Sequence, residues 1–135
     1  MFRNLLKWVF LFSLITLLLA ACNPSGPDLI PERRSGSQGA EGYCRREDSN
    51  LMVRVRNQSN EDVFVQTTTT VTFSPGGTES VSTAPMPGGS MTDVTVPIPS
   101  ACFNPDCDFA ITVDVDNEVE EAVENNNTAD GTCIG

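Results

Sequence analysis

Apolar and polar side chains alternate with a period of two along much of this chain. The alternation runs through LMVRVR (51–56), VFVQTTTTVTF (63–73), VTVPI (94–98) and FAITVDV (109–115). Successive side chains of a β-strand point to opposite faces of a sheet, whereas an amphipathic helix requires a period of 3.6 residues. Val, Ile and Thr dominate these stretches, and their branched β-carbons favour strand over helix. The pattern therefore predicts strands that are buried on one face.

Turn-forming residues separate these stretches. NQSNED, SPGGTE and PMPGGS interrupt the alternation, and the Gly76-Gly77 pair suits the positive φ angles of a tight hairpin. Pro97 and Pro99 cannot donate to a ladder, so they mark an edge strand or the end of a strand. The only helical candidate, 118–124, is too short to be stable alone. About seven short strands without a helix predict an all-β antiparallel sandwich.

The N-terminal segment MFRNLLKWVFLFSLITLLLAAC has the organisation of a secretion signal. Arg3 and Lys7 precede an apolar run, and small residues follow it before Cys22. The run is shorter than the roughly twenty residues of a spanning helix, although a retained anchor helix is the alternative. Leu19-Ala20-Ala21-Cys22 resembles the lipobox of bacterial lipoproteins. That resemblance implies cleavage after residue 21 and a diacylglycerol group on Cys22.

Lipidation anchors a protein in a membrane without spanning it, because two or three acyl chains suffice for durable attachment. Asn23 follows the cysteine, whereas lipoproteins retained in the inner membrane of Gram-negative bacteria usually carry Asp there. The resemblance thus implies a lipid anchor in the cell envelope, with the outer membrane or the cell surface as the expected location.

The segment 22–42 is expected to be a lipid-anchored flexible linker. Its sequence after the cysteine, NPSGPDLIPERRSGSQGAEG, is rich in Pro, Gly, Ser and charged residues and has little apolar surface to bury. We therefore expect a signal peptide at 1–21, this linker, and one β-sandwich domain at 43–135, a length that suits one small domain.

The net charge of −10 and the absence of histidine exclude several functions. A nucleic-acid-binding surface needs clustered Lys and Arg, which such an acidic chain lacks. Without histidine, neither a Ser-His nor a Cys-His nucleophile can form. Paired carboxylates could serve acid–base catalysis, but the acids gather at one strand end and a small sandwich leaves little room for a cleft. The sequence predicts a protein that is not an enzyme.

Four cysteines remain in the domain if Cys22 is lipidated: Cys44, Cys102, Cys107 and Cys133. An even number in a small exported domain indicates disulfides. Among the possible pairings we favour Cys102–Cys107 across a short turn, with Cys44–Cys133 tying the first strand to the last. A four-cysteine zinc site is the alternative, although such sites usually show two close pairs and this chain has one.

Three segments of the domain together resemble a known family. LMVRVRNQSNEDV (51–63) is similar to the early strand and turn of CARDB-type domains, the bacterial cell-adhesion-related sandwiches, and PMPGGSMTDVTVPIP (85–99) is similar to their proline-glycine turn and following strand. FAITVDVDNEVEEAVENNNTADG (109–131) resembles the C-terminal signature of the family. The resemblance implies an immunoglobulin-like sandwich of about seven strands and no catalytic residues. The matched signature positions are Val113, Asp114, Asn117, Val119, Glu121, Glu124, Asn126 and Asn127.

The C-terminal signature concentrates Asp, Asn and Glu between two expected strands. Such side chains exchange hydrogen bonds with nearby backbone groups, which is how an irregular crossing satisfies its amides. The strand alternation places Asp114 and Asp116 on the outward face. We expect a structural corner built mainly from Asn117, Glu121, Asn126 and Asn127.

A calcium site is the alternative for the same segment. Ca²⁺ prefers carboxylate oxygens, and crowded carboxylates without Lys or Arg repel one another unless a cation neutralises them. An EF-hand is excluded, because Val119 replaces the turn glycine and Asn125 the bidentate glutamate. The candidate ligands are Asp114, Asp116, Glu118, Glu120, Glu121 and Glu124.

The lipid anchor, the linker and the disulfide-linked sandwich together predict a non-catalytic, surface-exposed lipoprotein. We expect it to act as an adhesion or binding module for an extracellular protein or polysaccharide, with the membrane as a second partner through the lipid. The alternative is a calcium-stabilised structural subunit of a cell-envelope complex. No other cofactor is expected.

Overall fold

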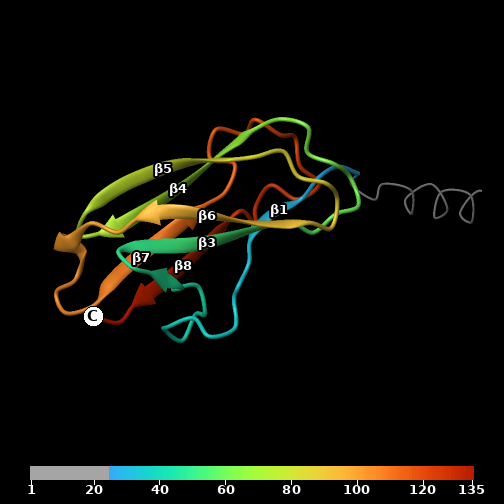
Figure 1. The fold of residues 1–135 in the computed structure, drawn as a ribbon. Coiled ribbons are helices and arrows are strands. Elements are labelled where there is room, and N and C mark those ends of the chain that lie inside the picture. The colour runs from blue at the N-terminus through green and yellow to red at the C-terminus, as the bar shows by residue number, and fades with distance from the viewer. Residues whose placement is uncertain (1–24) are drawn as a thin grey trace, which may run out of the picture.

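The computed structural model describes residues 25–135, which form two antiparallel sheets packed face to face (Figure 1). The expected all-β, immunoglobulin-like sandwich of about seven strands is confirmed, and the described residues form eight strands, two of which have only two or three residues. Residues 1–24, with the signal peptide and Cys22, lie outside the described residues. The strands are β1 (Leu29–Pro31), β2 (Arg46–Glu47), β3 (Asn50–Asn57), β4 (Thr67–Ser74), β5 (Gly77–Thr83), β6 (Met91–Pro97), β7 (Cys107–Thr112) and β8 (Thr128–Cys133).

The first sheet is built around β3. Its partner on one side is β6, and the shorter strands β1 and β2 share the other side. Because β6 pairs only with β3, it is an edge strand, as the prolines at its end predict. The second sheet has the order β5-β4-β7-β8, and Phe73 pairs with Gly77 where the expected hairpin joins β4 to β5.

The apolar and polar residues that alternate in the sequence of these strands alternate between buried and more exposed positions in the structure. In β3, every second residue from Leu51 to Asn57 is buried, and the residues between them are half-buried. Facing side chains of β4, β6 and β7 complete the core, where Phe73 and Phe109 lie with ring centroids 6.2 Å apart. The largest fully buried apolar side chains are Leu29, Leu51, Val53, Val55, Val71, Val96, Ile111 and Val113.

The sandwich has two opposite ends. We call the end where the described chain begins the N-terminal end; the loop between β3 and β4 and the segment between β7 and β8 lie there (Figure 1). The hairpin between β4 and β5 and the chain terminus lie at the opposite, C-terminal end. Among the described residues, the only helix is the 3₁₀ turn Ser100–Cys102. In this part of the chain, no helix has the length and apolar character that a membrane crossing requires.

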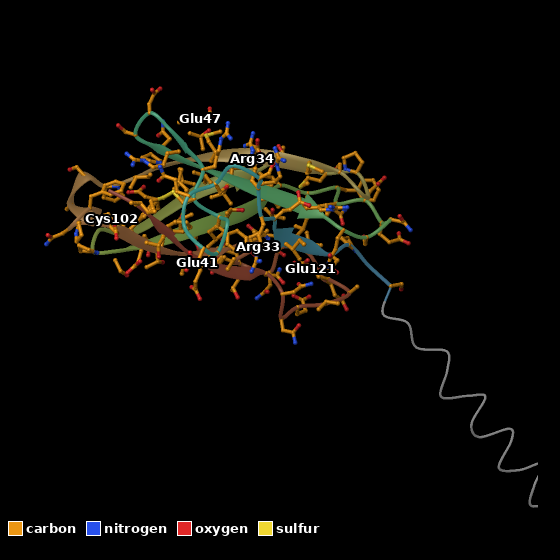
Figure 2. All side chains as sticks on the ribbon, turned by 90° about the horizontal axis from the view of Figure 1, so that it is seen from below. Arg33, Arg34, Glu41, Glu47, Cys102 and Glu121 are labelled. Carbon is orange, nitrogen blue, oxygen red and sulfur yellow. A yellow bond between two sulfur atoms is a disulfide. The ribbon has the colours of Figure 1, made fainter. Side chains whose placement is uncertain are left out.

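The prediction that residues 22–42 form a flexible linker is wrong for most of this segment. Leu29 is fully buried in β1, which pairs with β3, and the Glu32 amide donates to the Arg54 carbonyl at 2.8 Å. Further along, the Arg34 guanidinium contacts Asp93 at 2.8 Å. Figure 2 shows Arg33, Arg34 and Glu41 on a segment that follows the sandwich instead of leaving it. Composition alone indicated a tether, but the short apolar LIP strand within it finds a long-range partner.

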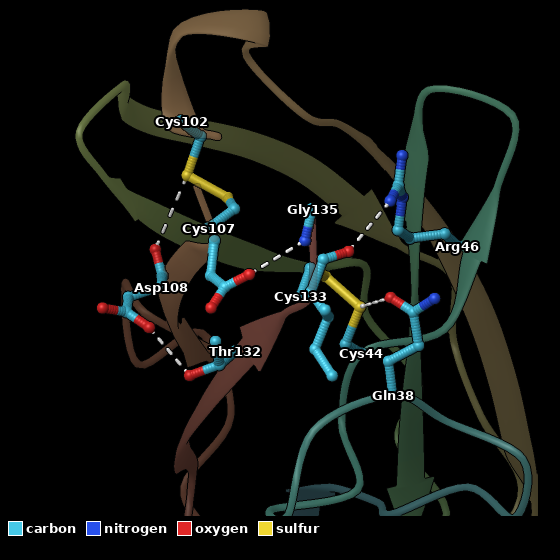
Figure 3. The surroundings of a disulfide bond; sticks show 11 residues. Gln38, Cys44, Arg46, Cys102, Cys107, Asp108, Thr132, Cys133 and Gly135 are labelled. Carbon is cyan, nitrogen blue, oxygen red and sulfur yellow. Dashed lines mark hydrogen bonds between the residues drawn. A yellow bond between two sulfur atoms is a disulfide. The ribbon is translucent and has the colours of Figure 1, made fainter. Parts of the chain in front are cut away.

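Two disulfides close the C-terminal end (Figure 3). They join Cys44 to Cys133 and Cys102 to Cys107, which are the pairs favoured from the sequence. Cys107 is the cross-strand partner of Cys133 in the β7–β8 ladder, so the two bridges are neighbours. All four cysteines are buried. The first bridge spans 89 residues and the second spans 5.

We predict that the long bridge contributes more stability than the short one. Loop-closure entropy assigns about 4.5 kcal/mol to a loop of the first length and about 2 kcal/mol to the second. Denaturant unfolding of the C44S/C133S and C102S/C107S double variants measures the difference, and each variant serves as control for the other. An equal or larger loss in C102S/C107S contradicts the prediction.

Candidate functional site

The segment between β7 and β8 crosses the N-terminal end without a helix or a strand. Asp114 and Asn117 both adopt positive φ angles, of 50° and 49°, which Asp and Asn tolerate better than most residues. The Asn117 amide donates to the Asp114 carbonyl at 3.0 Å, and the Val113 amide donates to the Asn127 carbonyl at 2.9 Å. These bonds fold residues 113–127 into a corner across the end of the sandwich.

Asp114 is buried, with 2% of its surface exposed, so the expected outward orientation is wrong. The reason is that β7 ends at Thr112, and the left-handed turn at Asp114 breaks the alternation. Its carboxylate accepts hydrogen bonds from the amides of Glu118 at 2.9 Å and Val119 at 3.1 Å. Burial raises the pKa of Asp114 to about 6, and the adjacent Glu118 carboxylate adds to that rise.

Glu118 connects the same corner to the second sheet. Its carboxylate accepts a hydrogen bond from the Thr68 hydroxyl at 2.7 Å and from the Thr68 amide at 3.4 Å. Hydrogen bonding with Asp114, and then with Thr68, lowers the pKa of Glu118. At a pH between their two pKa values, Glu118 therefore carries the negative charge and Asp114 carries the proton.

Glu121 lies beside β1 (Figure 2) and is 7% exposed. One carboxylate oxygen accepts a hydrogen bond from the Leu29 amide and the other from the Asn127 side-chain amide. Burial raises the pKa of Glu121 to about 7, although both hydrogen bonds oppose the rise. The Glu121 side chain therefore links β1, the first strand, to Asn127, the residue directly before the last strand, β8.

Asp28 extends this network and was not anticipated from the sequence. Its carboxylate accepts hydrogen bonds from the Asn126 side chain at 2.9 Å and the Gln58 side chain at 2.7 Å, and its own amide donates to the Asn57 side chain at 3.2 Å. The apolar LIP triplet that follows it is the sequence signal that could have revealed a strand here. We call this set of buried polar residues, together with the half-buried Asn126, the polar corner: Asp28, Asn57, Asp114, Glu121, Asn126 and Asn127.

The candidate calcium ligands do not converge on one position. Asp114 and Glu121 each bind two donors inside the protein, and one oxygen of Glu124 accepts the Glu121 amide at 2.7 Å. Asp116 is exposed on the turn. Across residues 25–135, no three acidic or cysteine side chains are grouped so that they could hold a metal ion. The polar corner does not fit a calcium site, and its chemistry is that of a hydrogen-bonded structural corner.

Depressions elsewhere on the described surface are shallow. One of about 290 Å³ lies on the outer face of the second sheet around Ala110, with Asp108 and Asp130 beside it. Another, of about 230 Å³, lies at the C-terminal end and includes Arg46 and Phe103. Both are smaller than the roughly 300–1,000 Å³ of typical small-molecule sites.

Replacing Asp114 by alanine is predicted to destabilise the fold by about 1–3 kcal/mol, because the amides of Glu118 and Val119 lose their buried acceptor. Asp116 is the matched control, since it is exposed two residues away, and D116A should change stability by less than about 0.5 kcal/mol. Urea unfolding of both variants is the measurement. Similar losses of stability in D114A and D116A would contradict the role of Asp114 as the acceptor of these two amides.

Glu121 is predicted to make stability depend on pH above its unfolded pKa of 4.5. A raised folded pKa means that the folded state binds more protons, so the stabilisation is complete below pH 4.5 and declines as pH rises through about 7. Rotation of the Asn127 amide would present its oxygen, which has no hydrogen-bond partner, to neutral Glu121. Unfolding free energies at pH 5 and pH 8 should differ more in the wild type than in E121Q. An equal pH dependence in both proteins refutes this role of Glu121.

Comparison with solved structures agrees with the sandwich fold, and two of the matching domains illustrate it. The NMR structure of a domain from a Methanosarcina acetivorans protein described as a cell surface protein has a TM-score of 0.64 at 17% identity, covering 82% of this chain and 92% of that one. The crystal structure of the CARDB domain of a Pyrococcus furiosus protein in complex with di-metal ions has a TM-score of 0.58 at 21% identity, covering 81% and 93%.

No curated protein sequence matches this chain. The sequence model of the CARDB family, in contrast, matches residues 26–130, a span that starts just before β1 and ends within β8. It thus includes both the expected linker residues that fold into β1 and the whole polar corner. The chain belongs to the CARDB family.

Proposed function

We propose that this protein is a lipoprotein, anchored through Cys22, whose CARDB domain binds an extracellular protein or polysaccharide at the cell surface. The family match over residues 26–130 carries the proposal, since CARDB is a non-enzymatic, cell-surface type of domain. The lipobox-like Leu19-Ala20-Ala21-Cys22 supports the anchor. The rigid, disulfide-closed sandwich supports binding through exposed surface.

A lipid on Cys22 would hold the domain close to the membrane. The Pro27 carbonyl accepts a hydrogen bond from the Ala122 amide at 2.9 Å, so the chain is fixed to the domain from that residue on. Five residue steps separate Cys22 from Pro27, and a fully extended chain of that length spans at most about 18 Å. The proposed tether is therefore much shorter than a linker of 22–42 implied.

The short tether makes the C-terminal end the surface that we propose for the partner. That end is held rigid by the two disulfides and carries a depression lined by Arg46, Ser49, Ile98, Ser100 and Phe103. The Arg46 guanidinium lies over the Phe103 ring, 4.6 Å from its centroid. It forms no ion pair within the described part of the chain, which supports a role in contacting an acidic or polar partner.

The structural-subunit alternative has less support. The di-metal ions of the Pyrococcus furiosus domain have no counterpart among converging ligands within residues 25–135. Recovery of the protein in a stoichiometric envelope complex would favour the structural alternative, whereas recovery with a separate extracellular partner would favour the proposal.

Replacing Cys22 by serine tests the anchor. The expected result is loss of the protein from the membrane fraction or a block in processing, because serine cannot form the thioether. Fractionation and intact mass provide the measurement, and an unchanged membrane fraction with unchanged mass contradicts the proposal.

A photo-crosslinking residue at Ser100 in intact cells tests the partner surface. Asn125, which is exposed at the opposite end, is the control position. We expect Ser100 to capture an extracellular protein or a polysaccharide, and Asn125 to capture neither. Turnover of a glycan or peptide that is lost on changing one carboxylate would contradict a non-catalytic module.

A further inference from the structure

The loop between β3 and β4 presents an apolar tip at the N-terminal end. Phe64 is 83% exposed and Val65 is 48% exposed, although the preceding Val63 is buried. Val63 and Met86 form a bridge with two backbone hydrogen bonds of 2.8 and 2.9 Å. The tip is therefore held outward by a paired backbone, and its exposure does not result from a loose loop.

A second loop widens the apolar surface. Pro85 and Pro87 flank the bridged Met86 and are both exposed. Together with Val63 and Phe64 they line a depression of about 270 Å³. A large exposed aromatic side chain within such a patch marks an interaction surface more often than an isolated exposed apolar residue does.

We propose that this apolar tip, formed by Phe64, Val65, Pro85 and Pro87, inserts into the interfacial region of the lipid bilayer that holds Cys22. The inference rests on the proposed lipid anchor. The chain enters the domain at the same end as the tip (Figure 1), and Pro27 is fixed to that end by the Ala122 amide. With a span of at most about 18 Å between Cys22 and Pro27, the lipid surface is the nearest partner for this end.

The charges around the tip specify which lipid surface it fits. Glu61 and Asp62 precede Phe64 and are exposed. Residues 58–135 contain no Lys or Arg, so no cation from these loops offsets the acidic groups. Exposed Glu118, Glu120 and Glu124 lie on the corner at the same end. An anionic bilayer would repel this end at low ionic strength, whereas a zwitterionic bilayer accepts the aromatic side chain without that repulsion.

A single tryptophan placed at the tip tests the inference in the full-length lipidated protein. The only native tryptophan, Trp8, lies in the segment that signal cleavage removes, so F64W gives one reporter in the mature chain. I134W is the matched control, because Ile134 is also exposed but lies at the C-terminal end. Both proteins are reconstituted in phosphatidylcholine vesicles with brominated acyl chains, which quench tryptophan on contact.

We expect blue-shifted emission and strong quenching of F64W, no quenching of I134W, and weaker F64W quenching when phosphatidylglycerol is added at low salt. Equal quenching of the two variants, or none in F64W, overturns the inference. Mass spectrometry of the same samples shows whether Cys22 carries the lipid, and so distinguishes a failure of the membrane-facing tip from a failure of the anchor. Lipid on Cys22 with unquenched F64W refutes the membrane-facing tip alone, whereas a Cys22 without lipid refutes the proposed anchor.

Discussion

The Glu121 carboxylate connects β1, the first strand of the domain, to the segment 113–127 that leads into the last strand, β8. The Leu29 amide is buried and needs an acceptor, and Glu121 supplies it from 92 residues away. The same carboxylate receives the side-chain amide of Asn127, whose carbonyl in turn accepts the Val113 amide. Removing this group would leave two donors, the Leu29 amide and the Asn127 side-chain amide, without their acceptor, and each such loss costs free energy. The burial that makes Glu121 effective also raises its pKa to about 7.

The long disulfide complements this polar contact at the opposite end of the same segment. Cys44 follows the segment that begins with β1, and its bond to Cys133 fixes that segment to β8. Residues 27–44 are thus attached at both of their ends. The attachment makes this segment part of the folded domain, and under the proposed lipid anchor on Cys22 it determines which end of the sandwich faces the membrane.

The sequence predicted those parts of the fold that depend on local pattern. The alternation in β3 requires only one buried face, so Leu51, Val53 and Val55 could be assigned to the core from their spacing. The disulfide pairing followed from an even cysteine count and short spacing. β1, in contrast, has three residues and is stabilised by contacts with β3 and Glu121, which no local window contains.

The polar corner was predictable as a corner but not in its geometry. Asp and Asn composition indicated an irregular crossing, yet the orientation of Asp114 depends on the positive φ at that residue. Beyond the end of the strand, the period of two no longer predicts which face of the sheet a side chain lies on. Asp28 was missed for a related reason, because its partners Gln58 and Asn126 come from separate loops.

Amide hydrogen exchange at Leu29 tests most directly whether residues 27–44 belong to the folded domain. The account predicts that this amide exchanges only with global unfolding, at a rate close to that of core amides such as Val53, because it is buried and bound to Glu121. Exchange of the Leu29 amide at the rate of an unstructured chain, while Val53 stays protected, would contradict it.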